Sequence, residues 1–154
     1  MENAEEGRPL FAPPNIRATF ADDGSIIIDS AQPLGDYETH LGEMLRYWAT
    51  KSPDRLFLAE RNQDDEWRRI SYAEAALATD ALSQSLIDRG LSAQRPVMVL
   101  SGNSIDHALL ALGSMQIGIP VVPLSPAYSL MSQDFNKLSA LFELVTPGLI
   151  YVAD

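Results

Sequence analysis

The chain has 154 residues, of which 46% are hydrophobic and 21% charged, a composition typical of a globular domain rather than a disordered or membrane-spanning chain. It contains no cysteine, which excludes disulfides and thiolate metal sites and favours a reducing compartment, and its net charge of −10 disfavours nucleic acid and anionic lipid as partners. Because no apolar run reaches about 18 residues and the amino terminus is acidic rather than signal-like, the sequence predicts a cytoplasmic protein with no membrane contact.

Proline, glycine and acidic residues dominate residues 1–40, where we expect an extended amino-terminal arm. One short regular element is predicted within this arm. Asp23 and Gly24 form a turn signal that favours a hairpin between residues 16–20 and 26–29.

A helix and a second hairpin are expected next. Apolar residues recur with the helical period from Leu41 onward, with Thr39 as the expected cap and Pro53 as the stop. Two strand-like runs follow on either side of a polar, charged turn, and they are residues 56–60 and 67–70. The charges at this turn are most simply explained as a solvated hairpin tip.

The middle of the chain predicts a long helix followed by a strand-helix-strand unit. Ser71 and Glu74 have the spacing of a capping box, which marks the start of the long helix. Asn103 or Ser104 is placed to cap the later helix, and Gly118 to end it in the left-handed conformation. This helix separates two apolar runs, as the crossover between parallel strands requires, and the three segments are residues 97–100, 105–116 and 121–124.

A further helix over residues 133–145, capped by Ser132, and a third apolar run over residues 149–152 complete the pattern. The expected fold class is therefore α/β, a three-layer β-α-β-α-β half of a parallel sheet preceded by a helix and a β-hairpin. We expect this partial α/β subdomain to occupy residues 41–154. Its helices cover three parallel strands only in part, so we expect exposed apolar surface, self-association or a longer parent polypeptide.

The sequence contains no recognisable catalytic constellation. His40 and His107 have no supporting nucleophile motif, and the glycine patterns of serine hydrolases, dinucleotide-binding folds and P-loops are absent. No cluster of histidine ligands is present for a metal. We therefore assign no catalytic residue, no cofactor-binding residue and no metal ligand.

One position in the predicted sheet nevertheless supports a ligand site. Ligands of open parallel sheets bind beyond the carboxyl ends of the strands, where Ser101 and Asn103 precede a helix with free amides. His107 lies one turn into that helix, and Tyr128 is placed to border a pocket with its large apolar face and its hydroxyl. The alternative, which we favour on the residues alone, is that these side chains turn the chain, cap the helix and pack.

Several segments resemble a known enzyme superfamily. The segment ISYAEA, residues 70–75, resembles the first core motif of adenylate-forming enzymes, which include acyl-CoA synthetases, luciferases and peptide-synthetase adenylation domains. The segment MQIGIPVVPLSPAYS, residues 115–129, resembles the second. Over about residues 33–154 the chain looks like the N-terminal region of feruloyl-CoA synthetases, on the segments WATKSPDRLFLAERNQDDEWRRISYAEA, LSGNSIDHALLALGSMQIGIPVVPLSPAYSL and SQDFNKLSALFELVTPGLIYVAD.

The resemblance implies part of the larger N-terminal domain of an ATP-dependent acid–CoA ligase. Its parent would join ferulate or a related hydroxycinnamate to AMP, release pyrophosphate and pass the acyl group to coenzyme A, using ATP, Mg²⁺ and CoA. The family's phosphate loop, adenine motif, ribose-binding aspartate, hinge and C-terminal lysine are missing from this sequence. We therefore expect the 154-residue chain alone to be inactive and to bind none of these cofactors tightly.

Two alternatives to this interpretation stay open. One is a free-standing, non-catalytic α/β module that binds a partner or self-associates through uncovered sheet surface. The other keeps the enzyme class and changes the acid, to a fatty acid or benzoate.

Overall fold

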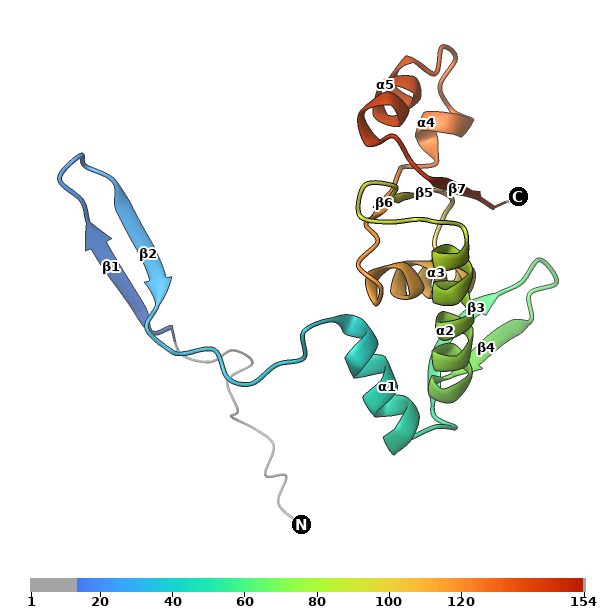
Figure 1. Cartoon of the computed structure of the whole chain (residues 1–154), viewed down its shortest axis with the longest axis horizontal. Helices are drawn as coiled ribbons and strands as arrows, with labels where there is room; N and C mark the ends of the chain where they lie inside the picture. Colours follow the sequence, from blue (N-terminus) through green and yellow to red (C-terminus); the bar gives the residue numbers. More distant parts are fainter. Residues whose placement is uncertain (1–13, 154) are drawn as a thin grey trace. The chain divides into compact units, whose positions relative to one another are not determined.

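The computed structural model of the chain describes residues 14–153. Its contacts cluster into two units, Met1–Tyr37 and Glu38–Asp154 (Figure 1). The part of the predicted arm before residue 14 lies outside the described residues.

The first unit contains a hairpin of β1 (Ile16–Phe20) and β2 (Ile26–Ser30), which confirms the predicted pairing. The strands are antiparallel, and every strand residue is exposed. Gly24 in the turn has φ = 84°, a left-handed conformation that glycine adopts without a steric penalty. Asp23 accepts the backbone N–H of Ser25 at 2.9 Å, which fixes the turn.

The second unit follows the predicted α/β order, with one short helix that the sequence did not predict, α4 (Figure 1). In chain order its elements are α1 (Leu41–Lys51), β3 (Leu56–Arg61), β4 (Trp67–Ser71), α2 (Tyr72–Asp88), β5 (Val97–Leu100), α3 (Ile105–Met115), β6 (Val121–Pro123), α4 (Ala127–Leu130), α5 (Asn136–Val145) and β7 (Leu149–Val152). Strands β3 and β4 form the predicted antiparallel hairpin.

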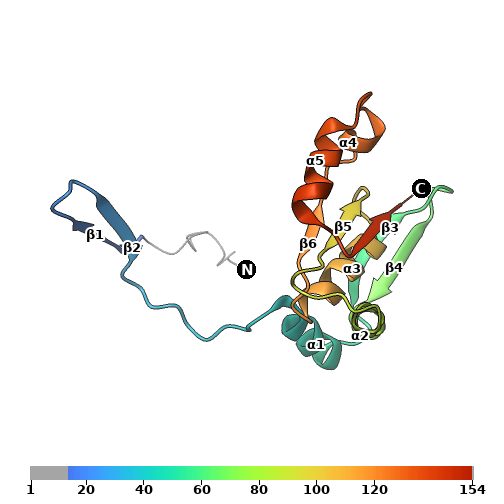
Figure 2. The ribbon, with the colours of Figure 1, turned by 45° about the horizontal axis from the view of Figure 1, so that its top comes forward.

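The three parallel strands form one sheet in the order β6-β5-β7, with β5 in the centre. Val97 and Val99 point to one face, where they pack with Leu86 of α2 and Leu110 of α3. Met98 points to the opposite face and lines a space next to α5. Helices therefore lie on both sides of the sheet (Figures 1 and 2), and the three-layer α/β fold predicted from the sequence is confirmed.

Helices α2 and α3 approach each other closely at small residues. A Cβ atom placed on Gly113 would lie only 3.2 Å from both the Leu82 Cβ and the Thr79 carbonyl oxygen. The Ser83 Oγ lies 2.8 Å from the Gly113 carbonyl oxygen and accepts a hydrogen bond from Gln116. This close contact fixes α3, and with it the loop that precedes α3, against α2.

Two predicted helix caps were wrong. Helix α1 begins after His40, whose side chain makes no capping hydrogen bond, while the Thr39 backbone amide donates to Glu43. Helix α5 begins only at Asn136, because Phe135 takes a left-handed φ of 53° that interrupts a helix starting at residue 133. Ser132 instead accepts the Phe135 amide in the turn before the helix.

Candidate functional site

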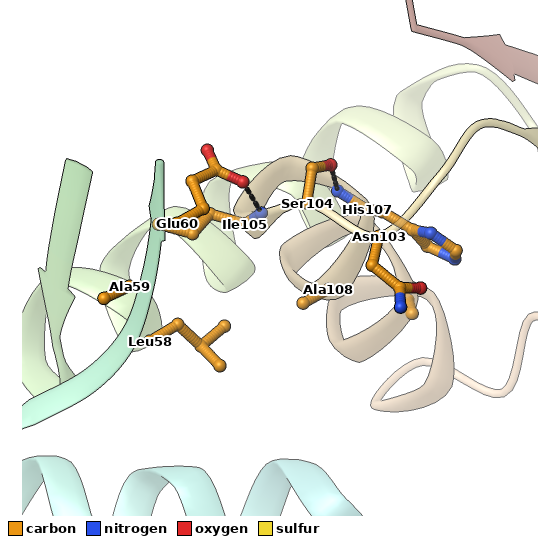
Figure 3. Close-up of a pocket in the computed structure, with 9 residues that line it drawn as sticks. Leu58, Ala59, Glu60, Asn103, Ser104, Ile105, His107 and Ala108 are labelled. Atoms are coloured by element: carbon orange, nitrogen blue, oxygen red, sulfur yellow. Dashed lines mark hydrogen bonds between the residues drawn. The ribbon is translucent and has the colours of Figure 1, made fainter. Parts of the chain in front are cut away.

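The candidate site is a cavity of about 370 Å³ between β3 and the start of α3. Figure 3 shows the β3 residues on one side and the loop and first turn of α3 on the other. The walls are mainly apolar, with a few polar groups at one end, and the lining consists of Leu58, Ala59, Glu60, Asn103, Ser104, Ile105, His107, Ala108 and Ala111. Apolar walls with few polar groups are typical of small-molecule sites.

The amino terminus of α3 is capped from within the protein. Ser104, one of the two predicted candidates, is the cap, and its Oγ accepts the His107 backbone N–H at 3.0 Å. The Glu60 carboxylate reaches across from β3 and accepts the Ile105 backbone N–H at 2.7 Å (Figure 3). These bonds occupy two of the amides that a helix terminus otherwise offers to an anion.

Arg68 of β4 connects this cap to the first turn of α3. It donates to Glu60 at 2.9 Å and, through both terminal nitrogens, to Asp106 at 2.8 and 2.7 Å. The hydrogen bonds from Arg68 hold the pKa of Asp106 below its usual value, and the same bonds raise the pKa of Arg68. The Glu60–Arg68–Asp106 network thus ties the β3–β4 hairpin to α3.

Two of the four residues singled out in the sequence come together here, since Asn103 and His107 both line the cavity. The His107 Nδ1 lies 3.1 Å from the Gly102 carbonyl oxygen. A carbonyl oxygen only accepts, so in this geometry Nδ1 donates, which leaves Nε2 as an acceptor when the ring is neutral. Asn103 adds an exposed amide that can both donate and accept.

The other two residues lie outside the cavity lining. Ser101 is buried, and its hydroxyl lies 3.2 Å from the Gly102 carbonyl oxygen. Tyr128 belongs to α4, and the Nζ atom of Lys137, a residue of α5, lies 4.4 Å from the centre of its ring. Both side chains therefore already have partners within the chain.

Sequence reasoning missed Glu60, the residue that closes the cap of α3. Its carboxylate and the Ile105 amide are 45 positions apart in the sequence, so no local spacing indicates that they meet. The charged cluster of the β3–β4 hairpin was interpreted as a solvated tip. Arg61 and Asp65 do form an exposed pair there, whereas Glu60 and Arg68 turn toward α3.

The electrostatics of the cavity suit a neutral ligand with hydrogen-bonding groups. Two carboxylates, Glu60 and Asp106, flank the start of α3, and Arg68 is already paired with both. A triphosphate would meet these carboxylates and find two helix amides taken, so the residues do not fit ATP phosphates. Within residues 14–153, no three His, Asp or Glu side chains gather in a way that would hold a metal ion.

None of the helices in residues 14–153 has the length and apolar character needed to cross a membrane.

A protein-family model and several solved structures match the chain. A model of the family described as AMP-binding enzyme matches residues 45–134. No curated protein sequence gives a significant match.

Three solved structures illustrate the shared fold. CmiS6 is 23% identical with a TM-score of 0.63, over 79% of this chain and 30% of its own. The fatty acid AMP ligase from Legionella pneumophila is 18% identical with a TM-score of 0.65, over 73% of this chain and 19% of its own. The N-terminal subdomain of NpsA from Klebsiella oxytoca, in complex with 3-hydroxyanthranilyl-AMSN, is 21% identical with a TM-score of 0.59, over 75% and 27%.

The chain thus spans between 19% and 30% of the length of these three proteins. At such low identities the structures support the fold, which is that of the N-terminal domain of adenylate-forming enzymes. The family model covers more than half of the 154 residues, from α1 through α4. The chain therefore belongs to the AMP-binding enzyme family.

Proposed function

We propose that the chain is the N-terminal portion of an ATP-dependent acid–CoA ligase, and specifically of one like feruloyl-CoA synthetase. The observation that supports the proposal is the family match over residues 45–134, which includes both motif-like segments in the expected order. These segments are residues 70–75 and 115–129.

The proposed reaction has two steps, and both belong to the complete enzyme. A carboxylate oxygen of ferulate attacks the α-phosphorus of ATP, and the bond to the departing pyrophosphate breaks. The thiol sulfur of coenzyme A then attacks the acyl carbon, the bond to AMP breaks, and the thiol loses its proton. Mg²⁺ would neutralise phosphate charge in the first step, but we assign no residue of this chain to it.

The two motif-like segments contribute structure in this chain. In ISYAEA, Ser71 and Glu74 form a reciprocal capping box at the start of α2, with Glu74 Oε2 accepting the Ser71 amide at 2.8 Å. Tyr72 packs against Phe57, and Ala75 is fully buried. Helix capping and packing thus account for the residue types in this segment, and no catalytic role is needed to explain them.

The second segment turns the chain from α3 into β6. Gly118 takes a left-handed φ of 73°, which favours glycine. The Ile119 amide donates to the Ser114 carbonyl at 2.9 Å and closes the end of the helix. Strand β6 then ends at Pro123, one residue earlier than the predicted run, and proline cannot donate to a strand ladder.

We propose Asn103 and His107 as the residues of this chain that border a bound ligand, at its neutral, hydrogen-bonding part. Their cavity offers a donor-acceptor amide, the His107 imidazole and an apolar floor that includes Leu58 and Ala108. Ser101 and Tyr128 remain candidates only for contacts outside this cavity.

The proposal is tested by reading the gene downstream of the codon for Asp154 and assaying its complete product. We expect a Ser/Thr/Gly-rich loop ending in Pro-Lys, and ferulate-dependent formation of AMP and a CoA thioester. The 154-residue chain serves as the control, and we expect it to give no rate above a protein-free blank. A stop codon at that point, or a ferulate-dependent rate from the chain alone, would contradict the proposal.

The identity of the acid is tested separately from the class of the enzyme. The similar structures include a fatty acid AMP ligase and a protein bound to an aromatic acyl compound, so the shared fold is compatible with both kinds of acid. A panel of ferulate, a medium-chain fatty acid and benzoate separates these cases. A higher kcat/KM for the fatty acid or for benzoate would keep the ligase and replace its substrate.

A further inference from the structure

A second cavity, which we call the α1 cavity, lies among α1, β3, α2 and α3. Its volume is about 280 Å³, and its walls include Trp48 of α1, Phe57 of β3 and Leu112 of α3. None of its lining residues lines the cavity at Asn103 and His107. All of its walls come from residues 41–112, in the interior of the sequence, so the described part of the chain forms this cavity by itself.

The two ends of the α1 cavity differ in their side chains. One end is aromatic, because the ring centre of Tyr72 lies 6.2 Å from that of Trp48 and 4.8 Å from that of Phe57. Leu41 and Met44, about two turns and one turn before Trp48 on α1, border the other end. These two side chains are 52% and 44% exposed. Exposed apolar side chains around a cavity mark a surface that a ligand or partner covers.

Two cations lie at the aromatic end. The Lys51 Nζ atom lies 5.3 Å from the centre of the Trp48 ring, and the Arg55 Cζ atom lies 5.9 Å from it. Both side chains are exposed, and neither forms an ion pair with a carboxylate of residues 14–153, whereas Arg68 forms two. On a chain with a net charge of −10, two cations without acidic partners beside an apolar cavity favour an anionic group at this end.

We propose that the α1 cavity binds a small apolar molecule that carries a carboxylate, such as a medium-chain fatty acid. The apolar chain lies in the cavity, and the carboxylate meets Lys51 and Arg55. Cavities for drug-sized ligands measure about 300–1,000 Å³, so this one suits a smaller molecule. At a packing density of about 0.74 it holds roughly 200 Å³ of atoms, which is room for an acid of about eight carbons. The proposal does not rest on the ligase reaction.

The fluorescence of Trp48 tests the proposal in the 154-residue chain. The chain has two tryptophans, and Trp67→Phe leaves Trp48 as the only one. We expect octanoate to change the emission of Trp48 saturably. Octan-1-ol, which lacks the carboxylate, should bind about tenfold more weakly, because two exposed charge contacts are lost. Dodecanoate should gain little affinity over octanoate, because about eight carbons already fill the cavity.

Two double variants separate the role of the two cations from a general effect of charge. Lys51→Gln combined with Arg55→Gln should weaken octanoate binding about tenfold, like the loss of the carboxylate. Arg69→Gln combined with Lys137→Gln is the matched control. It removes two other exposed cations that form no ion pair within residues 14–153, and it should leave the affinity for octanoate unchanged.

Photolabelling extends the test to the complete product of the gene, since the chain spans only 19% to 30% of the length of the similar structures. Octanoate with a diazirine at the end of its chain should label Leu41 or Met44, at the end of the cavity opposite the cations. The label, mapped by mass spectrometry, should decrease in the variant that lacks Lys51 and Arg55. Labelling confined to other parts of the product would overturn the proposal, whatever acid the enzyme activates.

The fluorescence titrations overturn the proposal in three further cases. No saturable change with octanoate would exclude the ligand and favour a protein partner for this surface. Equal affinities for octanoate and octan-1-ol would show that the carboxylate is not recognised. Equal losses in the two double variants would show that Lys51 and Arg55 have no specific part in binding.

Discussion

Replacing Glu60 with alanine tests whether the carboxylate from β3 holds the start of α3. The variant removes the acceptor of the Ile105 amide and one of the two carboxylates paired with Arg68. Asp106 stays bound to Arg68, so the guanidinium keeps a partner. The expected loss of stability therefore comes mainly from the missing cap of α3.

The size of this loss of stability follows from the burial of the Ile105 amide and the exposure of Arg68. Loss of a side-chain cap typically costs about 1 kcal/mol, and Ile105 is only 2% exposed, so its amide would be left with poor access to water. The ion pair adds at most about 1 kcal/mol, because the Arg68 side chain is 46% exposed. We expect Glu60→Ala to lower the free energy of unfolding by about 2 kcal/mol, and the melting temperature by on the order of 5 °C.

Urea denaturation followed by far-ultraviolet circular dichroism measures this change. Glu60→Gln keeps a carbonyl acceptor for the Ile105 amide, so it should lose less than half as much as Glu60→Ala. Asp64→Ala is the matched control, because Asp64 is an exposed carboxylate at the tip of the same hairpin and should cost within about 0.5 kcal/mol. Equal losses for Glu60→Ala and Asp64→Ala would refute the assigned role of Glu60.

Two further predictions concern packing and pH. Gly113→Val should lower the free energy of unfolding, measured by urea titration, by about 1–3 kcal/mol, because the valine side chain would clash with Leu82 and the Thr79 carbonyl oxygen. A variant as stable as the unmodified chain would contradict the close contact between α2 and α3. The pKa of Asp106 is lowered in the folded chain by Arg68, so its contribution to stability is present above the ordinary aspartate pKa and lost as the pH falls through the lowered value. Asp106→Asn should therefore be less stable than the unmodified chain at neutral pH, and its urea midpoint should fall less on acidification. The same pH dependence in both proteins would contradict the role of the Arg68–Asp106 pair.

The features that could be predicted from the sequence have their causes within a few residues. The Asp23–Gly24 turn, the Ser71–Glu74 capping box and the left-handed Gly118 each depend on local backbone geometry or on a hydrogen bond within one turn. The cap at Ser104 was narrowed to two neighbouring candidates, Asn103 and Ser104, for the same reason. Local rules failed at α5, where Phe135 takes a left-handed conformation that its residue type does not indicate.

In the candidate site, too, features with local causes could be predicted and features that depend on tertiary contacts could not. Asn103 and His107, which line the cavity, could be singled out because residues that follow a parallel strand and begin a helix lie at a predictable edge of the sheet. Glu60 and Leu58 were not found, because nothing local indicates that β3 lies beside α3. That contact depends on the packing of α2 against α3 and on the bonds from Arg68.

The sequence by itself determined the order of the strands and of every helix except α4, their turns and two of the four predicted amino-terminal caps, since these follow from dihedral preferences and short-range hydrogen bonds. Only the tertiary structure decided that β5 is the central strand and that Glu60 caps α3. The physical reason is that these features depend on which surfaces meet after the chain has folded. Burial of apolar area, which is not directional, selects those contacts across dozens of residues.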